Sequence, residues 1–332
     1  MRVVVTGAAG FLGSHLCDAL LARGDEVVGV DNFSTGRSDN LAGAREAPAF
    51  SLVEQDACER LAVGGAIDAI AHLACPASPP DYLRLPVETL RVSSIGTEMA
   101  VDLAARHDAR LLLASTSEVY GDPLVHPQTE TYWGNVNPIG PRSVYDEAKR
   151  FAEALTMAHC RANSLDAGIV RIFNTYGPRL RRDDGRVVSN FVTQSLDGAP
   201  LTIYGDGSQT RSFCFVSDLV AGLVAMIDRE VLGPVNLGNP VEVTMLELAR
   251  RVLALTGSSS PIVTAALPVD DPGRRCPDIS TAAALLDWRP LVGLDEGLGR
   301  TIAWYREVAT RVPPVPHAPA GGPGPRPDRG IA

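Results

Sequence analysis

Lysine is almost missing from this sequence. The chain has 332 residues and 30 basic side chains, of which only Lys149 is a lysine and all others are arginines. Because the two residues replace each other at most exposed positions, a lone lysine points to a site that needs a compact ammonium group. The net charge of -9 argues against nucleic-acid binding. An anionic substrate would therefore have to be held by a local cluster of arginines.

Paired cysteines and long apolar runs are missing as well. The six cysteines form no Cys-X-X-Cys pair, and their spacing does not match a metal site, so we predict no bound metal. Unpaired thiols are typical of a reducing compartment, which predicts a cytoplasmic protein. The longest apolar stretches, such as 219–227, are far shorter than the roughly 20 residues that cross a bilayer. We therefore predict no membrane partner.

Strand and helix patterns alternate through the first half of the chain. Short apolar runs predict buried strands, and helical periodicity predicts helices between them. The predicted strands are 2–6, 27–30, 50–53, 67–72, 110–114 and 167–172, and the main helices are 11–21, 86–106 and 145–161. This alternation is typical of a parallel sheet covered on both faces. We predict an α/β fold with a Rossmann-like, doubly wound parallel sheet and a smaller C-terminal substrate-binding lobe.

A glycine-rich loop joins the first predicted strand to the first predicted helix. Gly7, Gly10 and Gly13 are spaced G-x-x-G-x-x-G. In such a loop the glycines allow a sharp turn, a close approach to a pyrophosphate and tight packing of helix on strand. Asp31 ends the second strand, where a carboxylate can bind a ribose 2′-hydroxyl and would repel a 2′-phosphate. The loop therefore predicts a dinucleotide cofactor, NAD rather than NADP.

The composition also suggests where the chain divides. Beyond residue 173, glycine, proline, arginine and aspartate become frequent and the predicted elements shorten. We predict a NAD-binding Rossmann domain at 1–173 to which 216–240 returns, and a substrate-binding lobe at 174–215 and 241–310. Residues 313–332 are rich in proline and glycine, which predicts a disordered tail.

The lone lysine belongs to a second pattern, Tyr-X-X-X-Lys. Tyr145 and Lys149 are four residues apart on a predicted helix, so their side chains share one face. A free phenol has a pKa near 10, and a neighbouring cation lowers it and favours acceptance of a proton. The pattern predicts a base for removing the proton of a hydroxyl group.

These two motifs together resemble the extended short-chain dehydrogenase/reductase family. The resemblance implies that Thr116, in Ser115-Thr116-Ser117-Glu118, completes a catalytic group with Tyr145 and Lys149. It also implies hydride transfer from a sugar carbon to NAD. The cofactor residues implied, beyond the three glycines, Asp31, Tyr145 and Lys149, are Phe11, Leu12, Asn32, Phe33, Thr35, Gly36, Asp56, Ala57, Leu73, Cys75 and Thr175.

Longer stretches narrow the resemblance to the UDP-glucuronate decarboxylases. They include HLACPASPPDY (72–82), YWGNVNPIGPRSVYDEAKR (132–150) and RIFNTYGPRLRRDDGRVVSNF (171–191). The similar 4,6-dehydratases carry Thr-Asp-Glu, whereas this chain has Ser117 in the middle position. The resemblance implies oxidation at C4 of the sugar, loss of carbon dioxide from the resulting β-keto acid, and return of the hydride.

The same resemblance implies a set of substrate residues and a dimer. Ser117, Glu118 and Arg275 are expected at the sugar carboxylate, where a carboxylate beside a carboxylate would favour loss of carbon dioxide. The UDP-sugar contacts implied are Glu118, Tyr145, Asn174, Arg186, Val188, Tyr204, Gln209, Arg211 and Arg275. Arg181 and Arg182 are taken as ordinary surface charge. Helices near 86–106 and 144–161 are expected to pair in a homodimer.

Two alternatives stay open at this point. The first is another NAD-dependent sugar enzyme, either a UDP-glucuronate 4-epimerase or a nucleotide-sugar 4,6-dehydratase. The second is a non-catalytic NAD-sensing protein that keeps the fold. Retention of both Tyr145 and Lys149 argues against the sensor.

Overall fold

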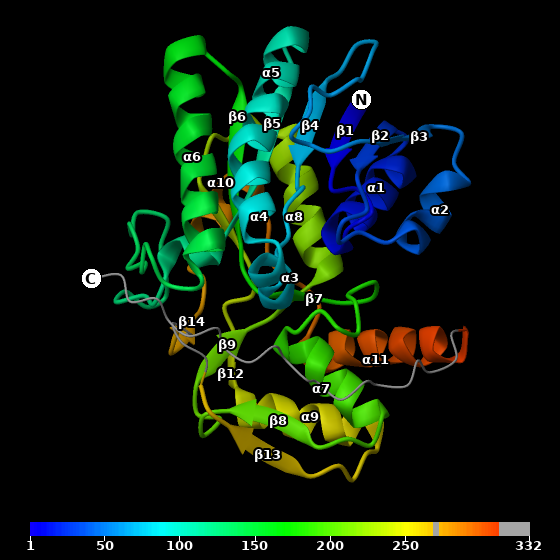
Figure 1. Cartoon of the computed structure of the whole chain (residues 1–332), viewed down its shortest axis with the longest axis vertical. Coiled ribbons are helices and arrows are strands. Elements are labelled where there is room, and N and C mark those ends of the chain that lie inside the picture. The colour runs from blue at the N-terminus through cyan, green and yellow to red at the C-terminus, as the bar shows by residue number, and fades with distance from the viewer. Residues whose placement is uncertain (268–271, 312–332) are drawn as a thin grey trace.

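Seven parallel strands form the central sheet of the protein (Figure 1). The computed structural model describes residues 1–267 and 272–311, so the predicted tail at 313–332 lies outside the described residues. The strands run in the order β11-β6-β5-β4-β1-β2-β3. They are β1 (Arg2–Thr6), β2 (Glu26–Asp31), β3 (Phe50–Glu54), β4 (Ala69–His72), β5 (Arg110–Thr116), β6 (Ala167–Ile172) and β11 (Val235–Leu237).

Helices cover both faces of this sheet because its strands are apolar on both sides. In β1, Val3 and Val5 pack in the core that includes helices α1 (Phe11–Arg23) and α8 (Val216–Asp228). Val4 points the other way, into the core with α5 (Thr97–His107). Successive side chains of a strand face opposite sides, so a continuous valine run is the expected sequence of a strand buried on both faces. The α/β doubly wound fold is confirmed.

The predicted long helix at 86–106 is present, but one turn in its middle is wider than an α-helical turn. The segment consists of α4 (Pro86–Arg91), a π-helical turn η2 (Val92–Gly96) and α5. Within it, the Thr97 hydroxyl donates to the Ser93 carbonyl and the Ser94 hydroxyl donates to the Leu90 carbonyl. Such side-chain bonds compete with regular helical bonding, and π turns in helices occur frequently at functional sites.

The remaining elements of the sheet-bearing half lie around the carboxyl ends of the strands or on the faces of the sheet. In Figure 1, α4, α5 and α6 lie together on one side of the molecule. The elements are η1 (Ser38–Leu41), α2 (Ala42–Arg45), α3 (Pro79–Arg84), η3 (Ser117–Tyr120) and α6 (Ser143–Asn163).

Short strands and three helices form the second region, drawn below the sheet in Figure 1. β8 (Leu201–Tyr204) pairs with β13 (Ile262–Ala265), and β9 (Thr210–Ser212) lies between β12 (Glu242–Thr244) and β14 (Arg274–Arg275). β7 (Thr175–Tyr176) and β10 (Cys214–Phe215) pair at the junction of the two regions. The helices are α7 (Val187–Leu196), α9 (Met245–Thr256) and α11 (Leu294–Arg311). Helix α10 (Ser280–Leu286) packs against β11 and α8 beside the sheet.

Candidate active site

One cavity of about 570 Å³ lies between the carboxyl ends of the sheet strands and the second region. In open α/β sheets this is where ligands bind, and the volume is that of a small-molecule site. Most predicted site residues line it: Gly7, Gly10, Phe11, Leu12, Gly13, Asp31, Asn32, Thr35, Gly36, Asp56, Ala57, Leu73, Cys75, Thr116, Ser117, Glu118, Tyr145, Lys149, Asn174, Thr175, Arg186 and Arg275.

The glycine loop has the shape that a pyrophosphate requires. Gly7 has a φ of +72°, a conformation that side chains rarely adopt. A Cβ atom added at Gly13 would lie 2.0 Å from the carbonyl oxygen of Gly7, so only glycine fits where α1 meets the loop. No side chain caps the first turn of α1 at Gly10. Its free backbone N–H groups can therefore bind an anion, and the loop fits a dinucleotide phosphate.

Asp31 holds the loop and faces the same cavity. Its carboxylate accepts hydrogen bonds from the backbone N–H groups of Ala9 and Phe33, each at 2.8 Å. Burial raises the pKa of this carboxyl, and the two N–H donors act in the opposite direction. A carboxylate fixed at this place is compatible with a ribose diol and unfavourable for a 2′-phosphate.

Tyr145, Thr116 and Lys149 meet at the carboxyl end of β5. Thr116 is the last residue of β5, and α6 carries both Tyr145 and Lys149. The side chains of Tyr145 and Thr116 are hydrogen-bonded. The Lys149 ammonium donates to the carbonyl oxygen of Ala114 at 2.9 Å and lies 5.9 Å from the centroid of the Tyr145 ring. The three residues expected to act together are thus brought together.

We expected the nearby cation to lower the pKa of Tyr145, but this prediction is wrong, because the pKa is raised in the protein. Burial raises this pKa well above its ordinary value, and the neighbouring Cys75 and Glu118 side chains raise it further. The hydrogen bond with Thr116 and the charge of Arg186 oppose this rise. The Tyr-X-X-X-Lys pattern predicts the nearby cation but not the burial of the phenol. Tyr145 is only 6% exposed, and burial favours the neutral form of a phenol.

Glu118 lies between two arginines. Its carboxylate accepts a hydrogen bond from Arg142 at 2.7 Å and pairs with Arg275 at 3.5 Å. Burial alone would raise the pKa of Glu118, but the two guanidinium groups outweigh it and hold the pKa well below its usual range. Glu118 is therefore ionised, but the positive charges of Arg142 and Arg275 offset its negative charge. It repels a second carboxylate less than we expected from the sequence.

Asp146 completes this cluster, and neither it nor Arg142 was predicted. The carboxyl groups of Asp146 and Glu118 are hydrogen-bonded to each other. Burial and the charge of Glu118 raise the pKa of Asp146 to about 8, so at neutral pH Asp146 carries the proton of this bond. Both residues lie in the stretch 132–150, close to Tyr145, but their pairing partner Glu118 is more than 20 positions away.

Arg275 offers a donor to the cavity. Its side chain is 6% exposed, and its Nε has no hydrogen-bond partner among the residues that the structure describes. A buried guanidinium N–H without a partner is unfavourable. Arg275 lines the cavity beside Glu118, and the positive charge of its guanidinium suits an anionic substrate group.

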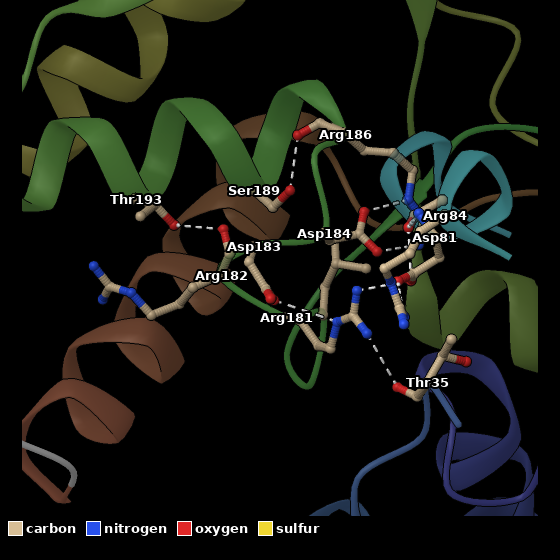
Figure 2. A network of polar contacts seen from close by, with 12 residues as sticks. Thr35, Asp81, Arg84, Arg181, Arg182, Asp183, Asp184, Arg186, Ser189 and Thr193 are labelled. Carbon is tan, nitrogen blue, oxygen red and sulfur yellow. Dashed lines mark hydrogen bonds and ion pairs between the residues drawn. The ribbon is translucent and has the colours of Figure 1, made fainter. Parts of the chain in front are cut away.

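The loop between β7 and α7 is tied across the cavity (Figure 2). Arg181 pairs with Asp81 of α3 at 2.7 Å and donates to the backbone carbonyl of Thr35 at 3.3 Å. Its side chain is 19% exposed and it lines the cavity. Treating Arg181 as ordinary surface charge was therefore wrong. Arg186 of the same loop forms two hydrogen bonds with Asp184.

Five predicted residues are not part of the cavity lining. Phe33 packs at the edge of the core, and Val188 is buried in α7. Arg211 donates to backbone carbonyls that include those of Pro272 and Gly273. Tyr204 is 44% exposed, and the Gln209 side chain donates to its carbonyl. Their roles stay predictions.

The sequence predicts neither a bound metal nor a membrane-spanning segment, and the described residues bear on both predictions. No group of three or more His, Cys, Asp or Glu side chains among them is placed to hold a metal ion. No helix in the described part of the chain combines the length and the apolar character that crossing a bilayer requires.

The fold and this cavity define the class of the protein. Residues 3–238 match the NAD dependent epimerase/dehydratase family. The match covers more than half of the chain, so the protein belongs to this family. The dependence of the family on NAD confirms the predicted cofactor.

Within the family, the chain is similar to two decarboxylases. It is 55% identical to UDP-glucuronic acid decarboxylase 1 of Arabidopsis thaliana over 306 residues, 92% of this chain and 70% of the relative. It is 52% identical to UDP-glucuronic acid decarboxylase 1 of Xenopus tropicalis, over 92% of this chain and 72% of the relative.

A solved structure with bound ligands is also similar. UDP-glucuronic acid 4-epimerase from Bacillus cereus, in complex with UDP-glucuronic acid and NAD, is 28% identical to this chain. The TM-score is 0.83, and the match covers 93% of this chain and 100% of the epimerase. The predicted relationship to UDP-glucuronate enzymes is confirmed.

Proposed function

We propose that this protein catalyses the NAD-dependent decarboxylation of UDP-glucuronate to UDP-xylose. The observation that carries the proposal is the meeting of Glu118 and Arg275 with Tyr145 in one cavity beside the glycine loop. Decarboxylases that are 52–55% identical over 92% of the chain support the same reaction.

The chemistry needs a base at C4 and a cation at C6. The glycine loop, Asp31 and the other cofactor residues of the lining would hold NAD, which would supply the hydride acceptor for C4 and the hydride donor for the last step. We assign Tyr145 to take the proton of the C4 hydroxyl, with Thr116 holding the phenol in place. Because burial favours the neutral phenol, the nearby Lys149 ammonium has to stabilise its charged form. Oxidised C4 stands β to the carboxylate, so the C5–C6 bond can break with its electrons entering the C4 carbonyl as an enolate.

We assign the residues around C6 from their charges. Arg275, whose guanidinium lies beside Glu118 in the cavity lining, is suited to bind the sugar carboxylate. Glu118 pairs with Arg275 and orients it, and Arg142 balances the charge of Glu118. Ser117 is buried next to Thr116 and lines the cavity at the same end. The UDP group is proposed to bind near Asn174 and Arg186, in the part of the cavity lined by the second region.

The experiment is to incubate the purified protein with UDP-glucuronate and to determine the products by mass spectrometry. A UDP-pentose lighter by one carbon dioxide, without net NADH, is the expected result. An unchanged mass with a new isomer would instead identify the 4-epimerase, whose solved relative has the same fold. Loss of water would identify a dehydratase, and no reaction despite bound NAD would favour the sensor.

We also propose a homodimer formed through α4 and α6. Val87 and Leu90 of α4 and Phe151 of α6 are large apolar side chains that are 42–60% exposed. Neighbouring exposed apolar residues of this kind favour a protein contact. Light scattering in solution tests the dimer, and F151E is expected to shift it toward monomer.

The division into two lobes and the compartment are proposals as well. Return of α8 and β11 to the sheet supports a cofactor domain of 1–173 with 216–240. The six cysteines are all free thiols, which supports a cytoplasmic location.

A further inference from the structure

The proposed reaction requires a proton from solvent in every turnover. The substrate loses its carboxylate as neutral carbon dioxide, and C5 gains a hydrogen that the substrate does not bring. One proton therefore has to reach a cavity whose catalytic side chains are almost fully buried. This requirement rests on the proposed function, and it raises the question of which residues carry the proton inward.

Asp146 stands between the active-site cavity and a second, smaller cavity. On one side its carboxyl group is hydrogen-bonded to Glu118, which lines the main cavity. On the other side it lines a polar cavity of about 250 Å³. The residues around this smaller cavity are Gly121, Asp122, Asn135, Val136, Asn137, Arg142 and Asp146.

One oxygen of Asp146 has no protein partner. Asp146 is 6% exposed, and its Oδ1 is buried without a hydrogen-bond partner among the described residues. Buried polar atoms of this kind normally bind another group or an ordered water. The smaller cavity is large enough for several waters, since each needs only about 30 Å³. Oδ1 itself is closed off from solvent, and the smaller cavity, which Asp146 lines, is the nearest space from which water can exchange a proton with this carboxyl group.

We propose that Asp146 supplies solvent protons to the active site, as a positioning residue that acts through Glu118. Asp146 holds a proton against Glu118, and water in the smaller cavity renews it. The route then runs from the smaller cavity to Asp146, to Glu118 and into the main cavity.

The proton balance closes along this route. As the C5–C6 bond breaks, its electron pair enters the enolate and carbon dioxide leaves. Asp146 passes its proton to Glu118, and Glu118 passes a proton to C5 while the C4 carbonyl re-forms. Asp146 is left as a carboxylate and takes a new proton from water in the smaller cavity. No oxidant or reductant is consumed.

The surrounding charges keep a proton on this carboxyl pair. The groups that face Asp146 are Glu118 of η3, Arg142 before α6, Arg275 of β14, and Tyr82 of α3. Asp122 lines the smaller cavity with it. Burial and Glu118 raise the pKa of Asp146 to about 8, although Arg142 and Arg275 act in the opposite direction. The proton rests on Asp146, and the hydrogen bond between the two carboxyl groups is the path along which it can pass to Glu118.

The test compares D146N with wild-type enzyme and with E147Q. Asn keeps the size of the side chain and an N–H donor to Glu118, but it cannot pass on a proton. Glu147 is the next residue, 38% exposed and paired with Arg150, so E147Q is a matched control. UDP-xylose formation, carbon dioxide release and KM for UDP-glucuronate are measured across pH.

In D146N, kcat is expected to fall by about 10²-fold, within the range of general acid catalysis, while KM stays unchanged. Wild-type kcat should fall as the pH rises through about 8, because deprotonated Asp146 has no proton to give. D146N should lose this alkaline fall, and D146E should regain it. E147Q should match wild type in both respects.

Three results would overturn the proposal. The first is wild-type kcat and pH profile in D146N. The second is a low kcat with the alkaline fall intact, since Asp146 would then only hold Glu118 in place. The third is wild-type enzyme that releases no carbon dioxide, which removes the proposed function as well. If D146N does not fold, the wild-type and D146E profiles decide, and a flat wild-type profile contradicts the relay.

Discussion

The two ends of the active-site cavity are built in different ways. At the cofactor end, a strand, a loop and a helix that follow one another in the chain present backbone N–H groups. At the sugar end, side chains from η3, α6 and β14 meet in a network of charges. The first end depends on backbone shape, and the second depends on balanced charge. Mutations should therefore affect binding at one end and chemistry at the other.

Tyr145→Phe is expected to have the largest effect. Removing the hydroxyl removes the proposed base at C4 and the hydrogen bond with Thr116. Loss of a general base lowers kcat by about 10³-fold, whereas NAD affinity should change little. Steady-state kinetics and NAD titration measure the two effects. Tyr132→Phe, which changes a phenol outside the cavity lining, is the control, and a Y145F enzyme with near-normal kcat contradicts the assignment.

Glu118→Gln is expected to come next. The change leaves Arg142 and Arg275 without the charge that balances them, so we expect kcat to fall by about 10²-fold. NAD affinity should again be unchanged. Single-turnover measurement of carbon dioxide release from UDP-glucuronate checks the rate. Glu296→Gln, in an exposed ion pair with Arg300, should leave it as in wild type. Full-rate decarboxylation by E118Q would remove the proposed role of Glu118.

Gly13→Ala tests the cofactor end, where we expect weaker NAD binding instead of slower chemistry. The new methyl group would meet the Gly7 carbonyl at 2.0 Å, which forces the loop to move. Overpacking of this kind costs about 1–3 kcal/mol, so NAD should bind about tenfold to a hundredfold more weakly. Calorimetric titration measures the affinity. Gly43→Ala, with nothing within 4 Å of the added carbon, should bind NAD normally, and equal affinity in both variants would refute the steric explanation.

Asp31→Asn should have the smallest of these effects. It removes a charge that repels a 2′-phosphate but keeps an oxygen for the Ala9 N–H. The preference for NAD over NADP should fall by about tenfold, as about 1.4 kcal/mol of like-charge repulsion is lost. Paired titrations with both nucleotides measure this ratio. Asp39→Asn, at an 83% exposed side chain, is the control, and an unchanged ratio in D31N would show that selectivity lies elsewhere.

The same contrast explains what could be predicted from the sequence. The glycine loop, Asp31 and the Tyr-X-X-X-Lys pair are local patterns, and their geometry follows from strand, loop and helix spacing. Arg142 and Asp146 act through Glu118, which no spacing rule connects to them. The raised pKa of Tyr145 comes from burial, and burial at a cavity depends on the whole fold.

The π turn η2 and the tie through Arg181 were missed for related reasons. The apolar periodicity of 86–106 is nearly unchanged by one wider turn, so the pattern favoured one continuous helix. Arg181 contacts Asp81 and Thr35, which lie 100 and 146 positions away. Such contacts can be expected only where a resemblance or a structure brings the segments together.

The central claim is that one cavity oxidises a sugar carbon, releases carbon dioxide and reduces the same carbon again. The most direct measurement uses UDP-glucuronate that carries deuterium at C4. We expect UDP-xylose that retains deuterium at C4, one carbon dioxide per turnover and no net NADH. Loss of the deuterium to solvent, or a product that keeps its C6 carboxylate, would contradict it.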